Sequence, residues 1–389
     1  MATTVNNVNN ELKKFKKNIA YSFLRSGRFD PYTSDSINAV IRRVRDLEAN
    51  GKQINVPLVD QLRGDGVATG VLSGNEEGVD NYGIPLWPSW ARHAVAFDRN
   101  TKKETSINIR DTATPLLGNW TKRIRRDDLI RAFHSFPTAS EQASRLIGSG
   151  NRINGIRYSD ASAGQRNSWL TANADRVLFG NATGNLVSGN YSSSLSNCDT
   201  TNDKMSTAVA SLAKRIAQRT TYPQINPWQI EGTDQEWYVM FMGSRPFRDL
   251  KADTAMLNAN RDARPRESGN VEKDNPIFSG SSTLVYDGII FKEIPEFDTQ
   301  LLLTGVGASS ADVAPCFLCG QSALAFVVGQ MPRVTRKDET DYQFREGVGT
   351  EMQYGVGKIA KAPVDQAGAI GNLIDWGMVT VHVAASADT

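Results

Sequence analysis

The sequence is poor in the residues that most often bind metals or act as nucleophiles. It has three cysteines and three histidines in 389 residues, and Cys316 and Cys319 form the only CxxC pair. A structural zinc site needs four ligands, usually in two paired clusters, so we expect no metal site. Because cysteine is among the most buried residue types, we expect Cys316 and Cys319 to lie in the core.

Long hydrophobic segments are missing as well. The longest uninterrupted apolar run, residues 323–328, has six residues, whereas a membrane-spanning helix needs ~20. The first 20 residues are polar and then basic, without the apolar core of a secretory signal. The low, odd cysteine count is typical of a reducing compartment. We therefore expect synthesis in the cytoplasm and no membrane association.

Neither sign of charge dominates the sequence. There are 44 Lys and Arg against 42 Asp and Glu, a net charge of +2. A protein whose main purpose is to coat DNA is usually more basic, because neutralising phosphates dominates that binding. The balance argues against nucleic-acid affinity as the main function and leaves local basic patches open.

The common catalytic and nucleotide-binding motifs are absent too. There is no GxxxxGK[ST] loop and no HExxH, and residues 320–324 lack the final glycine of a nucleophile elbow. We expect no cofactor. A chain of this size without a nucleophile, metal cluster or phosphate loop favours a structural protein. A soluble enzyme whose site combines acids from distant parts of the chain remains an alternative.

What the sequence does contain is a mixture of helical and strand patterns. Apolar residues at helical spacing predict one helix over 36–49 and another over 205–216, the second capped by Asn202 and Asp203. The region 104–150 reads as helical, with Thr114 as N-cap and Pro115 at the first helical position. Strands are predicted over 53–62, 84–98, 235–243, 283–294, 322–331 (ending at Pro332), 342–359 and 376–384. The fold class is α+β.

Two polar segments interrupt these elements. Residues 181–202 are rich in Asn, Ser, Gly and Thr, which predicts a loop. A Gly-rich, acidic stretch separates the strands predicted at 53–62 and 84–98. Most hairpin loops have about 2–5 residues, so we expect a long projecting hairpin that contacts another surface.

Several passages, taken in order, resemble a known family. They are LEANGKQINVPLVDQLRGDGVATGVLSGNEEGVDNYGIPLW (47–87), WARHAVAFD (90–98), ADRVLFGNATG (174–184), WYVMFMGSRPFRDLKAD (237–253) and NPIFSGSSTLVYDGIIFKEIPEF (275–297). The sequence is similar to the major capsid proteins of tailed double-stranded-DNA phages, which have the Hong Kong 97-type capsid fold. Within them it resembles the branch found in podophages like the coliphage called N-four.

The resemblance implies a domain organisation. It assigns an N-terminal arm and helix to 1–52, an extended hairpin called the E-loop to 53–98, and a peripheral domain with a long spine helix to 99–202. An axial domain over 203–330 and returning peripheral strands over 331–389 complete the chain. Some members of the family have a covalent Lys–Asn crosslink, and the resemblance assigns no residues of this sequence to it.

The resemblance also implies partners. The chain would assemble with itself as hexamers and pentamers, with a separate scaffolding protein and a portal protein at one vertex, around packaged double-stranded DNA. A decoration protein is left open. The protein would be made in the cytoplasm of the host bacterium and located in the virion. An encapsulin-like compartment shell and a minor virion protein are the alternatives.

Charge suggests where subunits contact one another. We expect basic residues around 122–126, together with Arg131, to pair with the acidic hairpin stretch of an adjacent subunit, because interfacial charges set register and specificity. The alternative is a solvated helix face. The candidate contact residues are Arg63, Asp65, Glu76, Glu77, Asp80, Arg123, Arg125 and Arg126.

Overall fold

The computed structural model has a mixed α/β fold. It describes residues 27–47, 51, 53–59, 62, 64–78, 81–104, 109–137, 151–220, 223–229, 235–262, 283–340, 344–361 and 373–387. The chain forms two compact units. The smaller includes Arg92–Arg125 and Pro332–Met352, and the larger includes Gly27–Ala91, Arg126–Met331 and Gln353–Thr389.

A seven-stranded sheet is the centre of the larger unit. Its strands are, in spatial order, β12 (Thr283–Tyr286), β13 (Ile289–Glu293), β11 (Glu236–Met242), β14 (Asp312–Cys319), β19 (Met378–Ala385) and β9 (Val177–Phe179), with β10 (Trp228–Gln229) beside β11. β11 pairs with β13 and β14, and Val239, Met240 and Phe241 in it are fully buried. The strand predicted over 235–243 is confirmed, and it lies inside the sheet. The segment 283–294, predicted as one strand, is divided by a turn between β12 and β13 at Asp287 and Gly288, both of which have positive φ.

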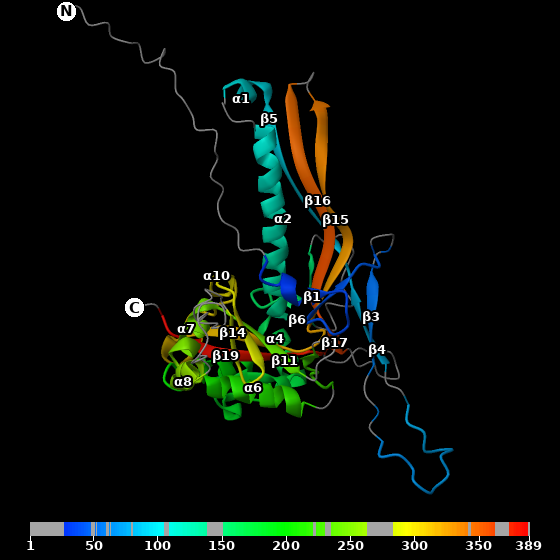
Figure 1. Cartoon of the computed structure of the whole chain (residues 1–389), viewed down its shortest axis with the longest axis vertical. Helices are drawn as coiled ribbons and strands as arrows, with labels where there is room; N and C mark the ends of the chain where they lie inside the picture. The colour runs from blue at the N-terminus through cyan, green and yellow to red at the C-terminus, as the bar shows by residue number, and fades with distance from the viewer. Residues whose placement is uncertain are drawn as a thin grey trace, which may run out of the picture. The chain divides into compact units, whose positions relative to one another are not determined.

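Three helices share a hydrophobic cluster with this sheet: α6 (Thr207–Arg219), α7 (Ser244–Ala252) and α8 (Thr254–Asp262). Val209, Ala213 and Ala217 line the buried face of α6 and pack in one hydrophobic cluster with the sheet. Figure 1 shows α6 and α7 close to β19. The predicted amphipathic helix is confirmed, but the predicted cap is wrong. The side chain of Ser206 accepts the hydrogen bond from the Val209 amide.

The predicted loop over 181–202 contains ordered structure. It holds the 3-10 turn η4 (Thr183–Asn185) and the helix α5 (Tyr191–Ser196). The Asn190 side chain caps α5 by accepting from the Ser193 amide at 3.1 Å. Tyr191 is buried in one cluster with α4 (Ala163–Ala172) and β9. The loop prediction is therefore wrong at α5, because asparagine and serine here cap a short helix.

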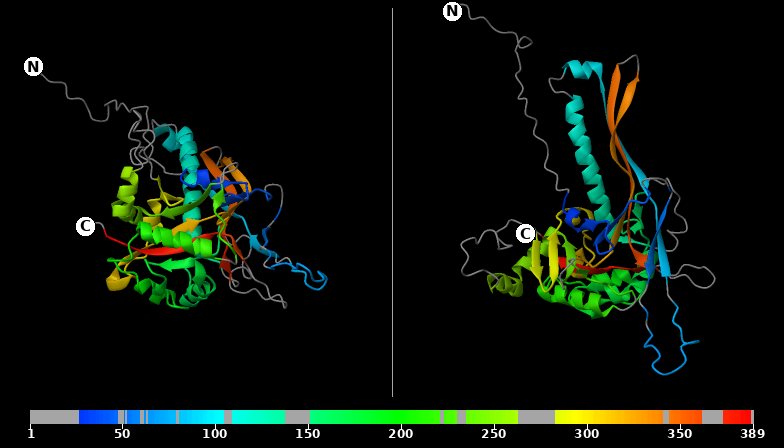
Figure 2. Two further views of the ribbon diagram at one scale, coloured as in Figure 1. Left: turned by 60° about the horizontal axis from the view of Figure 1, so that its bottom comes forward. Right: turned by 45° about the vertical axis from the view of Figure 1, so that its right-hand side comes forward.

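The predicted hairpin is present. β3 (Ile54–Val59) and β4 (Asn81–Leu86) pair antiparallel, from Ile54 opposite Leu86 to Val59 opposite Asn81. Their buried side chains alternate, which anchors the paired strands in a second hydrophobic cluster. Figure 2 shows the connecting loop extending away from the two strands. Residues 84–98, predicted as one strand, form the end of β4 and the separate strand β5 (Ser89–Asp98).

The predicted helix over 36–49 is wrong. Its described part contains the strand β2 (Ile41–Val44), which pairs in parallel with β1 (Thr33–Ser34) and with β15 (Leu324–Thr340). The full sheet order is β1-β2-β15-β16-β5, with β7 (Ile153–Asn154) on β16 (Arg345–Lys358). Ile41 is fully buried opposite Leu324. Pairing with a strand far along the chain outweighs the local helical spacing.

The smaller unit combines helix and strands. It holds α1 (Arg99–Glu104), the first part of α2 (Ile109–Phe133) and the outer parts of β5, β15 and β16. Figures 1 and 2 show this part of α2 running beside these strands. The helix begins at Ile109, so Pro115 lies inside it and the predicted start at Thr114 is wrong.

β15 also continues past the predicted end at Pro332. β2 pairs only with residues 324–327 of β15. Beyond these residues β2 no longer covers that edge of β15, and proline is tolerated at an open edge because its missing amide hydrogen is not needed there.

The remaining short elements all belong to the larger unit. They are η2 (Asp30–Tyr32), β6 (Ser135–Phe136), β8 (Ile156–Arg157), η3 (Ala174–Arg176), α10 (Glu296–Gln300), η5 (Ala308–Ser310), β17 (Ala360–Lys361) and β18 (Ile374–Asp375). β6 pairs with β8, and β17 pairs with β18.

Candidate functional site

The loop between β3 and β4 is held by its own glutamates. The Gly64 amide donates to Oε2 of Glu77 at 2.7 Å, and the Gly74 amide donates to Oε2 of Glu76 at 2.7 Å. Both glutamates are exposed. Their carboxylates therefore shape the loop while still facing outward.

The same hairpin exposes apolar side chains. Val71 is 74% exposed and Leu72 is 64% exposed at the loop, and Val59, Leu62 and Val67 are exposed as well. Single exposed apolar residues are ordinary, but several on one projecting hairpin mark an interaction surface. Covering a valine or leucine side chain is worth ~1.5–3 kcal/mol, so this loop favours contact with another surface.

The structure places the predicted contact residues differently. Arg63 and Asp80 lie outside the described residues, and Asp65 is exposed on the loop. On α2, Arg123 is exposed and Arg125 is half-buried. Contact of these residues with another subunit stays a prediction.

Arg126 differs from its neighbours on α2 because it is buried. Its guanidinium lies 2.9 Å from Glu296 and 2.8 Å from Asp127, both in the same chain. The pair with Glu296 joins α2 to α10, so the charge of Arg126 is balanced within its own subunit.

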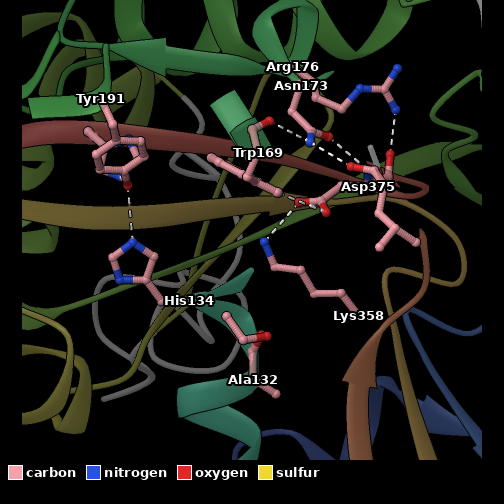
Figure 3. Close-up of polar contacts among 11 residues, drawn as sticks. Ala132, His134, Trp169, Asn173, Arg176, Tyr191, Lys358 and Asp375 are labelled. Atoms are coloured by element: carbon pink, nitrogen blue, oxygen red, sulfur yellow. Dashed lines mark hydrogen bonds and ion pairs between the residues drawn. The ribbon is translucent and has the colours of Figure 1, made fainter. Parts of the chain in front are cut away.

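A buried ion pair connects two late strands with helix α4. Nζ of Lys358, at the end of β16, lies 2.8 Å from Oδ2 of Asp375 in β18, and both side chains are almost fully buried. The Trp169 indole donates to Oδ1 of Asp375 at 3.3 Å, and Nζ of Lys358 lies 4.9 Å from the Trp169 ring centre. Figure 3 shows these groups converging. A buried charge pair is tolerable only with such additional partners.

Asn173 and Arg176 fasten the backbone around this pair. Oδ1 of Asn173 accepts from the Asp375 amide at 2.7 Å, and its Nδ2 donates to the Leu373 carbonyl at 3.0 Å. The buried guanidinium of Arg176 donates to the Asp375 carbonyl. Side chains from residues 169–176 thus position the β18 strand, which lies some 200 residues later in the chain.

Two buried histidines lie on either side of one tyrosine. The Tyr191 hydroxyl is 2.7 Å from Nε2 of His382 and 3.3 Å from Nε2 of His134. Burial, followed by the charge of Lys358, lowers the pKa of His382 to about 3. Burial, followed by the proximity of His382, also lowers the pKa of His134. Both imidazoles are therefore neutral at pH 7.

These histidines predict loss of stability in acid. Below its ordinary pKa of 6.5, His382 takes up a proton in the unfolded chain, whereas in the folded chain it does so only near pH 3. The free energy of unfolding should fall as the pH drops through that window, by ~1.4 kcal/mol per pH unit from His382 alone. His134 acts in the same direction. Urea unfolding at several pH values, with NMR of the imidazole protons, measures both effects.

A fold in which His382 is accessible would give a different result. In that case the His382 signal would titrate near its ordinary pKa, and the histidine contribution to the pH dependence of unfolding would vanish.

Asp128 centres another buried cluster in the larger unit. Its Oδ2 lies 2.6 Å from Nε of Arg152 and accepts from the Tyr354 hydroxyl at 2.6 Å. Burial, and then the charge of Asp128, raise the pKa of Tyr354. Asp128 thus links α2 with β16 and with the chain before β7.

The cysteines are core residues, as predicted. Cys316 and Cys319 are fully buried in β14, and burial raises the pKa of both thiols. Within the part of the chain that the structure describes, no three His, Cys, Asp or Glu side chains are grouped to hold a metal ion. None of the described helices is long and apolar enough to cross a membrane.

Sequence reasoning missed the buried polar clusters. Asp375 and His382 gave no signal, because their partners Asn173 and Tyr191 lie about 190–200 residues away. The apolar segments around them could only indicate burial. The loop glutamates, in contrast, were recognisable from their place in a long polar hairpin.

Solved structures with a similar fold are phage capsids. The capsid protein of cyanophage Pam1 is 30% identical over 100% of both chains, with a TM-score of 0.83. That of Ralstonia phage GP4 is 20% identical over 100% of both chains, with a TM-score of 0.69. That of Helicobacter pylori bacteriophage KHP40 is 13% identical over 99% of this chain and 98% of the other, with a TM-score of 0.62. The fold is therefore the Hong Kong 97-type phage capsid fold.

The sequence agrees with the fold. The family model described as phage capsid protein matches residues 3–387. No curated protein matches this chain. The chain belongs to the phage capsid protein family, and it is a structural major capsid protein of the virion head.

Proposed function

We propose that the subunit assembles as hexamers and pentamers into a closed icosahedral head around packaged double-stranded DNA, and that the loop between β3 and β4 contacts a neighbouring subunit. The observation that supports this most is the group of exposed apolar side chains on that hairpin. Closed symmetric shells repeat the same contact many times, so a modest contact per subunit is sufficient.

The proposal includes the remaining partners. A separate scaffolding protein would direct assembly, and a portal protein would replace one pentamer. A decoration protein is compatible with this arrangement. The near-balanced net charge of +2 suits an inner surface along which DNA moves without strong adhesion. The chain would be made in the bacterial cytoplasm and has no assigned catalytic role. The division into arm, E-loop, peripheral and axial domains is part of the same proposal.

Electron microscopy tests the proposal. The full chain is purified alone and with its scaffolding protein, and each sample is imaged in negative stain. We expect closed shells or capsomer rings. Monomers or dimers alone, with the scaffolding protein present, would contradict assembly by this chain.

A further inference from the structure

A positively charged pocket lies in the larger unit, apart from the hairpin. It has a volume of about 540 Å³, and its lining includes Arg131 in the last turn of α2, His134, Arg157 at the end of β8, Tyr158 and Gln300. We call it the arginine pocket. Sites for small ligands and side-chain groups commonly measure about 300–1,000 Å³, so it can receive a segment of another chain.

The charge of the pocket has one sign. Among the described residues that line it, the charged ones are Arg131 and Arg157. Arg131 lies 3.8 Å from Oδ1 of Asp128, whose other oxygen already binds Arg152. Across the described residues, no carboxylate forms an ion pair with Arg157. The pocket therefore favours an anionic group.

A third arginine adds to this charge. The Arg166 guanidinium lies 4.1 Å from the centre of the Tyr158 ring and donates to the Tyr158 carbonyl at 2.9 Å. The nearest exposed acid along the chain, Asp160, accepts from the Ser159 hydroxyl. Arg131 and Arg157 line the pocket, and the Arg166 guanidinium lies over the ring of Tyr158, another lining residue. Asp128, which also binds Arg152, is the carboxylate paired with Arg131.

Two buried polar atoms at the pocket have no hydrogen-bond partner in the described structure. They are Nδ1 of His134 and Oε1 of Gln300. The His134 residue is only 2% exposed. Figure 3 shows Nε2 of His134 directed at Tyr191, which leaves the other ring nitrogen facing away. An unsatisfied buried polar group is costly, so such atoms indicate a missing partner.

The unpartnered atoms favour a peptide over a simple anion. A carboxylate can accept from Arg131, Arg157 and an Nδ1–H of His134. Oε1 of Gln300 needs a donor, which a carboxylate lacks and a backbone amide supplies. An acidic residue within a chain segment offers both groups together.

We propose that the arginine pocket receives Glu76, with its neighbour Glu77, from the hairpin loop of a second copy of this chain. The loop is exposed, and each glutamate uses Oε2 for one backbone amide of its own loop. This inference rests on the proposed function. It assigns the contact with the hairpin glutamates to the arginine pocket and not to the helix face around Arg123.

Disulfide trapping tests this contact directly. Shells are formed from the double variant Glu76→Cys/Arg157→Cys and, as matched control, from Glu76→Cys/Arg123→Cys. The native thiols do not interfere, because all three are buried and burial raises the pKa of Cys198 to about 12. We expect cross-linked dimers from the first variant under mild oxidation and about tenfold fewer from the control. Equal cross-linking, or more in the control, would overturn the proposal.

Charge exchange provides the second measurement, in case the cysteine variants assemble poorly. Arg131→Glu/Arg157→Glu should lower the shell yield about tenfold or more. Adding Glu76→Lys/Glu77→Lys to the same chain should restore the shell yield. Normal shells from the arginine variant, or no rescue by the lysine variant, would contradict the contact. Failure of the unmodified chain to form shells would instead contradict the proposed function.

Discussion

Shells should be lost when the hairpin loop is shortened. Replacing residues 64–78 with a short turn removes Val71, Leu72 and both glutamates, but leaves the paired strands β3 and β4 intact. Since Val56, Leu58, Ile84 and Leu86 stay in their cluster, the subunit should remain folded. We expect no closed particles by electron microscopy and an unchanged circular dichroism spectrum. Each lost contact is modest, but it recurs in every subunit.

A milder pair of variants separates loss of contact from damage to the loop. Val71→Ser/Leu72→Ser should strongly reduce the particle yield, because it removes exposed apolar surface without altering the backbone. Ser73→Ala in the same loop should assemble normally. Closed shells from the shortened hairpin would show that the loop is dispensable.

Breaking the buried pair of Lys358 and Asp375 should destabilise the subunit severely. Lys358→Met leaves the Asp375 carboxylate buried without its counter-ion. Asp375→Ala likewise leaves the Lys358 ammonium buried without a counter-ion. Removing one partner of a buried pair costs ~3–5 kcal/mol. Urea denaturation of the purified subunit measures the change in the free energy of unfolding.

The double variant distinguishes the charge effect from packing. Lys358→Met/Asp375→Asn removes both charges while the asparagine oxygen can still accept from the Trp169 indole. We expect it to be more stable than Lys358→Met, because no uncompensated charge remains. As a control, Lys214→Met breaks the more exposed pair with Asp287, and exposed pairs contribute only ~0–1 kcal/mol. Equal losses from Lys358→Met and Lys214→Met would contradict this account.

Hydrophobic patterns predicted the helices and strands that depend on their own segment of the sequence. The run over β11 and the apolar stripe of α6 specify a central strand and an amphipathic helix, and the structure contains both. The stripe over 36–49 failed because β2 is fixed by β15, which lies some 280 residues later. No local spacing encodes such a partner. Pro332 misled the prediction because β2 leaves that edge of β15 open. Pro115 misled it because the helix begins before the proline, at Ile109.

The candidate site was predictable in part. The long polar hairpin and its glutamates were visible as a composition change between two strands. The arginine pocket was not, because Arg131, Arg157 and Gln300 come from three distant segments. Arg126 looked like its exposed neighbour Arg123 in sequence, yet Glu296 on α10 buries and neutralises it.

The most direct test of this account is a cryo-electron-microscopy map of particles assembled from the full chain. The account predicts hexamers and pentamers in which residues 64–78 of each subunit lie against a neighbouring subunit. It is contradicted by a map of closed shells in which this loop faces solvent in every subunit, or by the absence of any shell when the scaffolding protein is supplied.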